Sequence, residues 1–321
     1  MFNNIYSNIK KFIKENIIHI IIFIVFCALA LIHLPYTIDA PGGLININER
    51  MNIKIKGSYN ITFVNSHRAS LLKYLYSKIN KEWELIPNSD YLNENETIDD
   101  DNTREKLLLY NAFSTAYYVA HELANVDPKI IDSNIYVIYV DEDADTNLKI
   151  GDKISKLDDI EINDIKDIVE YINEKDVGYK LTVNNDKYIK INEYEDNKAL
   201  FISVICNYDY DTKIKYEYEK NEYGSSGGFM MALSIYDYLI PYDLTKGRKI
   251  AGTGTINLDG TVGEIGGVKQ KIITANKNKV DIFFIPEANY KEAKEVILER
   301  GYKLNIVSVK NINDAINYLN K

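Results

Sequence analysis

The chain has 321 residues, of which 46% are hydrophobic, and its formal net charge is −9. This length allows two modest domains beside a membrane anchor, and the acidic balance argues against a nucleic-acid partner, because phosphates repel such a surface. The two cysteines, Cys27 and Cys206, exclude a disulfide framework and a cysteine-based metal site.

The N-terminal segment, residues 1–36, predicts a cytoplasmic stub and a single membrane span. Residues 17–34 form an apolar run of eighteen residues, and a helix of that length spans about 27 Å, close to a bilayer core. Lys10, Lys11 and Lys14 precede the run, so the positive-inside tendency places the rest of the chain on the extracellular side of the cell membrane. A cleaved signal peptide is the alternative, because the run contains an Ala-Leu-Ala pattern. We favour the uncleaved anchor, since the run continues beyond that pattern.

Residues 37–127 predict a few strands followed by helices. The apolar stripe of the last helix includes His121, which we interpret as a partly buried histidine and not as a base. The predicted elements are a turn at 41–43, strands around 53–55 and 59–63, a helix over 69–80 with Leu71, Leu72, Leu75 and Tyr76 on one side, an acidic loop over 88–102 and a helix over 104–124.

From about residue 128 to residue 196 the pattern changes to short strands around one helix. The segment LKIGDKI from Leu148, followed by DDIEI from Asp158, resembles the LKxGDxI…INGxxI core of bacterial PDZ domains, with Asp-Asp where Asn-Gly is common. PDZ domains hold extended peptides by adding a strand to a sheet edge. The resemblance implies a peptide along residues 135–140 and the helix that begins near Ile165. A structural β module without a ligand is the alternative.

The C-terminal part, residues 197–321, alternates strands and helices, which indicates a layered α/β or α+β domain. The predicted strands cover residues 200–204, 213–219, 281–286 and 303–309, and the predicted helices cover 229–239, 270–276, 287–299 and 312–320.

Ser226 is the candidate nucleophile of this part. It lies in a Gly/Ser loop where a predicted strand gives way to a helix, so backbone N–H groups at the helix start would face an oxyanion. Gly224, Gly227 and Gly228 remove side chains that would block the approach of a substrate. Because a serine needs a base within hydrogen-bond reach, a second residue must accompany it.

Lys269 is the candidate base. The pair Gly266-Gly267 allows a sharp turn before it, and burial among its apolar neighbours would lower the pKa of its amine enough to accept a proton at neutral pH. These neighbours are Ile265, Val268, Ile272 and Ile273.

Two motifs in this order are similar to the proteolytic domain of Lon-type Ser-Lys proteases, whose motifs read GPSAG and GGxKxK. Here GSSGG precedes AGTGTINLDGTVGEIGGVKQKIITA, and the spacing agrees with that family, since 269 − 226 = 43 residues. The resemblance implies Ser226 as nucleophile, Lys269 as general base and Thr253 as a threonine near the lysine. We expect the backbone amides around Ser226 and Gly227 to hold the oxyanion. Lys271 competes with Lys269, and we take the first lysine of the pair as the base. Ser225 stands where the family has proline, and Gly227 where it has alanine.

The anchor, the PDZ-like module and the Ser-Lys motifs together resemble the membrane-anchored, PDZ-containing Lon-like proteases of bacteria. The implied fold is α+β: a Lon-type proteolytic domain, formed by residues 37–127 and 197–321, with the PDZ-like module 128–196 inserted into it and a transmembrane helix before it. Three modules in series are the alternative arrangement.

The predicted function is that of an ATP-independent serine endopeptidase, since no GxxxxGK[ST] motif occurs in the sequence. Its substrates would be peptides or unstructured protein segments outside the membrane, and the reaction calls for no cofactor or metal. Lon-type proteolytic domains often form hexameric rings, so the resemblance implies a homo-oligomer. Two alternatives remain: a catalytically silent PDZ scaffold at the membrane, and a serine hydrolase of another kind with His67 or His121 as its base.

Overall fold

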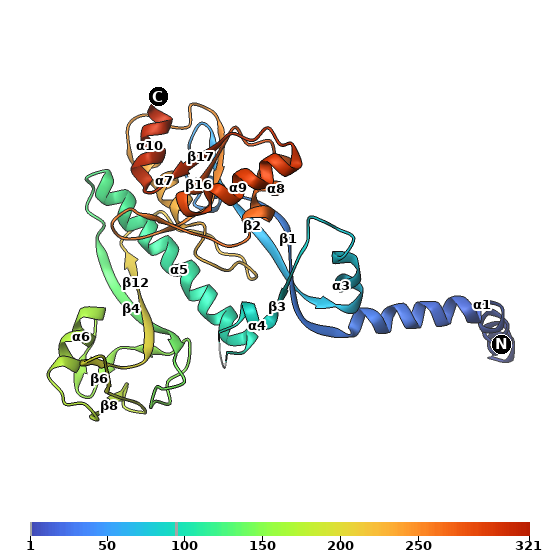
Figure 1. The fold of residues 1–321 in the computed structure, drawn as a ribbon, viewed down its shortest axis with the longest axis horizontal. Helices are drawn as coiled ribbons and strands as arrows, with labels where there is room; N and C mark the ends of the chain where they lie inside the picture. The colour runs from blue at the N-terminus through green and yellow to red at the C-terminus, as the bar shows by residue number, and fades with distance from the viewer. Residues whose placement is uncertain (1, 94–95) are drawn as a thin grey trace. The chain divides into compact units, whose positions relative to one another are not determined.

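A computed structural model describes residues 2–93 and 96–321 (Figure 1). The chain divides into two compact units, and each unit is built from two stretches of sequence. The boundary between the units falls within the predicted segment 37–127. Two long strands, at His33–Asn46 and Ser58–Ser70, each contribute residues to both units. The first unit comprises Met1–Pro41 and Val64–Tyr91, and the second comprises Gly42–Phe63 and Leu92–Lys321.

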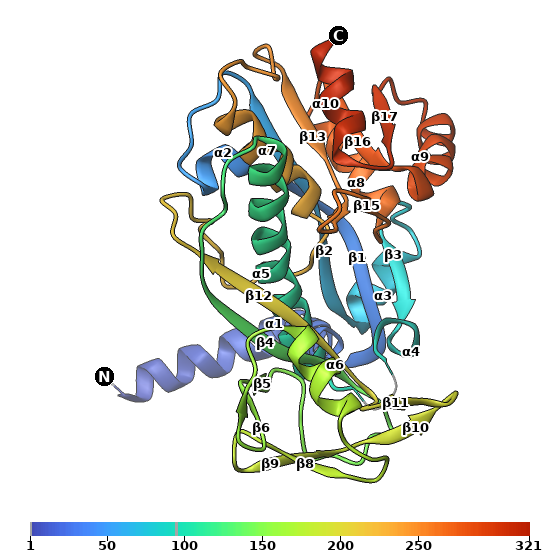
Figure 2. The ribbon, with the colours of Figure 1, turned by 90° about the vertical axis from the view of Figure 1, so that its left-hand side faces the viewer.

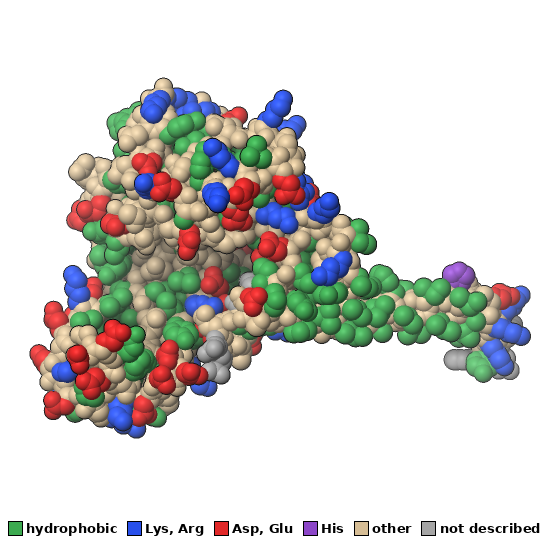
Figure 3. Space-filling view, in the orientation of Figure 1, with side chains coloured by type: hydrophobic (Ala, Val, Ile, Leu, Met, Phe, Trp, Pro, Cys, Tyr) green, Lys and Arg blue, Asp and Glu red, His purple; other side chains and the backbone are tan. Residues whose placement is uncertain are grey.

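A long apolar helix, α1 (Phe2–Leu31), begins the first unit. Its residues Ile5–Leu31 are long and apolar enough to cross a membrane, and a signal sequence would meet the same criteria. Hydrophobic side chains cover its surface along most of its length (Figure 3). The other elements that contribute to this unit are β1 (His33–Asn46), β2 (Ser58–Ser70), α3 (Leu71–Ser77), β3 (Glu84–Pro87) and α4 (Asn88–Tyr91).

Gly42 and Gly43 lie inside strand β1, so the predicted turn at residues 41–43 is wrong. A Cβ atom on Gly42 would lie 2.4 Å from the carbonyl oxygen of Phe63, and one on Gly43 would lie 3.1 Å from the Phe63 ring. A side chain at position 42 would collide with the backbone of Phe63, and one at position 43 would press against its ring, so glycine at these positions fits the close approach of Phe63 to the strand.

The second unit is organised around a sheet with helices on both faces (Figure 2). Its strand order is β17-β16-β13-β2-β1, and the pairings β17–β16, β16–β13 and β13–β2 are parallel. A parallel sheet is covered on both faces, and successive side chains of a strand point to opposite faces. The bounds are β13 (Lys249–Gly252), β16 (Ile282–Pro286) and β17 (Ile306–Val309), with α2 (Ile47–Arg50), α5 (Ile98–Leu123), α7 (Gly228–Leu239), α8 (Val268–Lys277), α9 (Glu287–Arg300) and α10 (Ile312–Asn320).

The alternation along β16 shows how the two faces are filled. Ile282 and Phe284 belong to a core that includes buried residues of α5, α7 and α10. Phe283 and Ile285 belong to a second core that includes residues of α8 and α9. A short antiparallel pair, β14 (Thr255–Ile256) and β15 (Val262–Gly263), follows β13. This region is mixed α/β, and its C-terminal helices and strands occur where the sequence predicts them, except for the segment 213–219.

A small β module with its own core lies between α5 and α7 in the sequence. Its buried residues run from Ile135 to Cys206, and its helix α6 (Ile165–Asn173) has the predicted bounds. Helix α5 precedes the module, helix α7 follows it, and both contribute residues to one core. Its strands are β4 (Ile130–Val140), β5 (Lys153–Ile154), β6 (Lys156–Leu157), β7 (Ile160–Glu161), β8 (Lys180–Val183), β9 (Lys187–Lys190), β10 (Asn192–Tyr194), β11 (Asn197–Ala199) and β12 (Ile202–Tyr210).

Strand β12 corrects the predicted boundary between residues 196 and 197. It pairs antiparallel with β4 from Ile202 opposite Val140 to Tyr210 opposite Ile130. The module therefore extends to this strand, although residues 202–210 lie in the range predicted as the second part of the protease domain.

Two predicted strands are absent from the described part of the chain. Residues 213–219 form no β-strand, although Ile214 and Tyr216 are buried in the main core. Ile53 and Ile55 lie in the loop after α2, and Ile53 is buried as well. In both segments the alternating apolar residues reflect burial of their side chains. Neither segment pairs with a neighbouring strand.

Candidate active site

Ser226 lies in the loop that leads into α7, and backbone hydrogen bonds fix this loop to the end of β13. Gly254 N–H donates to the carbonyl oxygen of Ser226 at 2.7 Å, and Phe229 N–H donates to that of Gly254 at 3.1 Å. Gly228 N–H donates to the carbonyl oxygen of Ser225 at 3.0 Å. The Ser226 side chain is thus held where the first turn of α7 meets the segment after β13.

The amine beside Ser226 belongs to Lys271. Its Nζ lies 3.1 Å from Ser226 Oγ and 3.1 Å from Thr253 Oγ1, and the residue is only 4% exposed. Lys269 lies two residues earlier on α8 and is partly exposed. The prediction that folding brings Lys269 to Ser226 is therefore wrong, and the competing lysine takes that place.

The phase of α8 explains which lysine turns inward. The helix begins at Val268, after Gly267 in the left-handed conformation with φ of 66°. Side chains two positions apart on a helix point roughly 200° apart, so the two lysines cannot face the same neighbour. Val268 and Ala275, both buried, lie three residues before Lys271 and four after it, but Ile272 and Ile273, also buried, lie three and four residues after Lys269. The apolar spacing in the sequence therefore does not distinguish the two lysines.

Thr253 completes the group, as the resemblance implies. Its side chain is fully buried, and its hydroxyl donates to the carbonyl oxygen of Ser226 at 3.2 Å. Its N–H donates to the carbonyl oxygen of Phe284 in the neighbouring strand at 3.1 Å. The end of β13 therefore places one hydroxyl between the serine loop and the amine of Lys271.

The glycines after Ser226 serve packing within the protein. A Cβ atom on Gly227 would lie 2.6 Å from Ile61 Cδ1, and one on Gly228 would lie 2.9 Å from Ile256 Cγ2. The prediction that these two glycines leave room for a substrate is corrected: they allow α7 to begin against the core.

Helix α5 holds the other side of the loop. Gly224, with φ of 92°, donates its N–H to the carbonyl oxygen of Glu105 at 3.0 Å. Burial raises the pKa of the Glu105 carboxyl, and the nearby Asp101 raises it further. The guanidinium of Arg104 pairs with Glu96, Asp101 and Glu105. Arg104, which joins these ion pairs, lies on α5 next to Glu105, the residue whose carbonyl oxygen accepts the hydrogen bond from Gly224.

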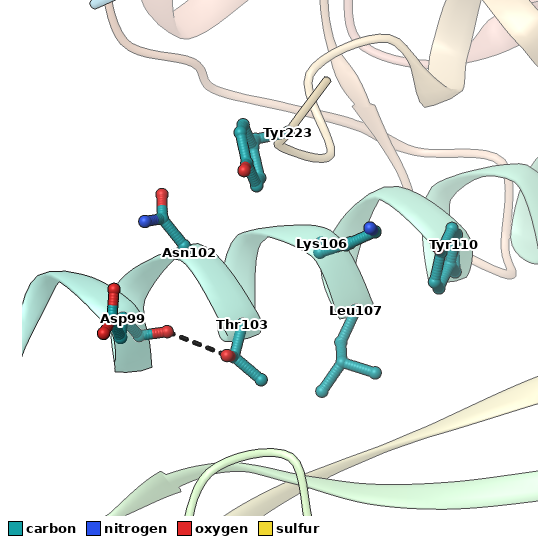
Figure 4. A pocket seen from close by; sticks show the side chains of 7 residues that line it. All are labelled: Asp99, Asn102, Thr103, Lys106, Leu107, Tyr110 and Tyr223. Atoms are coloured by element: carbon teal, nitrogen blue, oxygen red, sulfur yellow. Dashed lines mark hydrogen bonds between the residues drawn. The ribbon is translucent and has the colours of Figure 1, made fainter. Parts of the chain in front are cut away.

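A hollow of about 400 Å³ lies between α5 and the segment that leads to Ser226 (Figure 4). Tyr223, three residues before Ser226, faces the helix across the hollow, and Lys106 and Tyr110 lie on the helix side. Its lining combines aromatic, apolar and polar groups. The lining residues are Asp99, Asn102, Thr103, Lys106, Leu107, Tyr110 and Tyr223.

Among the residues that the structure describes, neither histidine considered as an alternative base hydrogen-bonds to Ser226. The Nδ1 atom of His121 lies 2.8 Å from the carbonyl oxygen of Tyr117, and its ring stacks on Tyr117 with 3.8 Å between centroids. His67 belongs to the other unit. Within residues 2–93 and 96–321, no group of three or more His, Cys, Asp or Glu side chains is arranged to hold a metal.

The sequence around this site has relatives of known family. Residues 220–320 match the Lon protease (S16) C-terminal proteolytic domain. The match contains Ser226, Thr253 and Lys271, so the predicted resemblance to Lon-type proteolytic domains is confirmed for this part of the chain.

Curated Lon proteases show the same relationship. The chain is 38% identical over 92 residues to the Lon protease of Aster yellows witches'-broom phytoplasma, which is 29% of this chain and 11% of the relative. It is 46% identical over 100 residues to that of Mycoplasma genitalium, which is 30% of this chain and 12% of the relative. It is 37% identical over 94 residues to that of Helicobacter pylori, 29% and 11% of the two chains. The chain thus aligns with about a tenth of the length of these Lon proteases.

Proposed function

We propose that the protein is a serine endopeptidase in which Ser226 is the nucleophile and Lys271 is the general base. The observation that carries this proposal is the 3.1 Å approach of Lys271 Nζ to Ser226 Oγ, inside the segment that matches a Lon proteolytic domain. A buried lysine beside a serine hydroxyl is an arrangement suited to acyl transfer, because burial disfavours the charged form of an amine.

The reaction follows from these two groups. The uncharged amine of Lys271 accepts the proton of Ser226 Oγ while the oxygen attacks the carbonyl carbon of the scissile peptide bond. The protonated amine then gives this proton to the departing amine of the substrate, which leaves an acyl-enzyme. Water attacks the acyl carbon and passes its proton to Lys271, and the serine leaves with a proton again.

The surrounding loop supplies the remaining parts. The N–H groups of Ser226 and Gly227, just before the first turn of α7, are the candidate donors to the oxyanion. Thr253 positions the amine of Lys271 through the 3.1 Å contact with its hydroxyl. The hollow beside Tyr223 is a suitable place for part of the substrate chain, because it borders the same loop.

We infer further that the enzyme is anchored by α1, with the second unit on the extracellular side, and that it cleaves without ATP. The anchor rests on the length and apolarity of Ile5–Leu31, and the orientation rests on the lysines before the apolar run. The proposed chemistry uses a serine, an amine and water, so no nucleotide takes part in bond cleavage. Peptides and unstructured segments are the proposed substrates, and a homo-oligomer remains a prediction from the resemblance.

We also infer that the inserted module is PDZ-like and binds an extended peptide, but at a different strand from the one predicted. Both edges of β4 are paired at Ile135 and Tyr136, with β12 on one side and β5 on the other. A peptide cannot add to an edge that is already paired. The outer strands of this sheet are β12 and the two-residue β5. Helix α5 covers β12 from Cys206 to Tyr208, which leaves Ile202–Val204 of the longer strand as the proposed docking edge.

The test is digestion of a library of unstructured peptides by the purified full-length chain and by its Ser226→Ala variant, without nucleotide. We expect cleavage by the wild type and none above background by the variant. Equal results for both proteins would favour a catalytically silent scaffold. Loss of cleavage in His121→Ala or His67→Ala, with full activity in Lys271→Ala, would instead favour a histidine-dependent hydrolase.

A further inference from the structure

Helix α3 in the first unit carries apolar side chains that the protein leaves uncovered. Leu75 is 52% exposed, Tyr76 is 51% exposed, and Ile79 in the turn after the helix is 80% exposed. Leu75 and Ile79 are four residues apart, a spacing that brings side chains to one side of a helical turn. The helix forms within the predicted range 69–80, and none of its residues is buried, so its apolar side is not part of the core.

This apolar surface begins beside the end of α1. Leu71, the first residue of α3, donates its N–H to the carbonyl oxygen of Ile32 at 2.9 Å, and α1 ends at Leu31. Leu31 and Ile32 are themselves exposed. The exposed side chains of α3 therefore continue the apolar surface of α1 at the point where that helix would leave a bilayer.

Aromatic and basic side chains surround the same surface. Trp83 packs edge-on against Tyr76 with 4.8 Å between ring centroids, and Tyr36 packs against Tyr74 at 5.6 Å. Lys78 places its Nζ 4.9 Å from the centre of the Tyr74 ring. Trp and Tyr are enriched at the membrane–water boundary, where an apolar ring and a polar tip are both satisfied, and lysine stems reach from apolar surroundings to charged headgroups.

We propose that α3 and the turn after it lie in the headgroup region of the membrane that α1 crosses, with Leu75, Tyr76 and Ile79 inserted among the lipids. A phospholipid surface is the occupant because the patch is continuous with a helix of membrane-spanning length and carries the aromatic residues typical of that boundary. The inference rests on the proposed membrane anchoring by α1. It gives the first unit a second contact with the bilayer, beside the helix itself.

Trp83 allows a direct test, because it is the single tryptophan of the chain. The full-length protein is reconstituted into phosphatidylcholine vesicles, with or without bromine atoms on the acyl chains near the headgroup, and its fluorescence is recorded. A second protein combines Ile79→Trp with Trp83→Phe, which moves the indole to the most exposed position of the patch. We expect brominated lipid to remove most of the Ile79→Trp emission, and a clear part of the emission of Trp83.

The double variant Leu75→Glu with Ile79→Glu is the matched control, since both positions are exposed and the changes leave the protein core intact. It should stay with the vesicles on flotation, through α1, and lose the quenching of Trp83. Failure of the wild type to float would contradict the proposed anchoring, and this inference with it. Flotation without quenching of either indole would overturn this inference alone and would indicate that another protein or a second copy covers the patch.

Discussion

At the scale of the residue, the site depends on which of two lysines faces Ser226. Lys269 and Lys271 have the same chemistry and nearly the same sequence neighbours. They differ in burial, because α8 directs Lys271 towards Thr253 and Ser226 and leaves Lys269 partly exposed. The different positions of the two lysines relative to Ser226 are therefore a property of helix phase.

This difference gives a matched pair of variants. We expect Lys271→Met to lower kcat by roughly 10²- to 10⁴-fold, the usual contribution of a general base, because methionine fills the space of lysine and accepts no proton. Lys269→Met should retain nearly full activity. Peptide hydrolysis by both variants, with circular dichroism to check folding, provides the measurement. Strong loss in Lys269→Met and little loss in Lys271→Met would contradict the assignment.

At the scale of the element, α5 contacts several parts of the second unit. It packs with α7 in the main core, supports Gly224 through the Glu105 carbonyl, and buries His121 near its C-terminal end. The helix also begins earlier than predicted, since a capping box formed by Thr97 and Asp100 starts it inside the predicted acidic loop.

Burial lowers the pKa of His121, and the hydrogen bond to the Tyr117 carbonyl opposes this only in part. The folded protein therefore binds a proton at His121 less readily than the unfolded chain, whose histidine pKa is about 6.5. Stability from this residue is present above that pH and is lost as the pH falls towards the lowered folded pKa.

We expect the free energy of unfolding to decrease between pH 7 and pH 5, and to decrease less in His121→Phe, which keeps a stacked ring and cannot be protonated. Urea unfolding in detergent at several pH values measures this. An identical pH dependence in the variant would show that His121 does not contribute.

At the scale of the whole molecule, the second unit joins a module with its own core to the core that carries the site. The connection runs through α5: Ser114 Oγ donates to the carbonyl oxygen of Tyr208 at 3.1 Å and accepts from Tyr208 N–H at 3.0 Å. Asn111 donates to the carbonyl oxygen of Cys206 at 3.0 Å. One helix thus contacts the sheet of the module and the serine helix, so the proposed peptide site at the free end of β12 has a direct structural connection to α7.

Ser114→Ala tests this connection. Removing the hydroxyl leaves the Tyr208 amide without its partner, and at about 1 kcal/mol for such a bond its hydrogen exchange should become roughly fivefold faster. Asn111→Ala is the control, because it frees the Cys206 carbonyl and leaves the Tyr208 amide bonded. Mass-spectrometric exchange on peptides of β12 compares them, and equal protection of Tyr208 in Ser114→Ala and wild type would contradict the role of this contact.

The sequence by itself determined the features that depend on nearby residues. Apolar periodicity located α6, α7, α9 and α10, the apolar run located α1, and the motifs around Ser226 and Gly266 identified the matched family. Only the tertiary structure decided that Lys271 faces Ser226, that Gly42 and Gly227 admit Phe63 and Ile61, and that β12 closes the edge of β4. These outcomes depend on helix phase and on pairing between segments far apart in the chain, and local propensity carries no information about either.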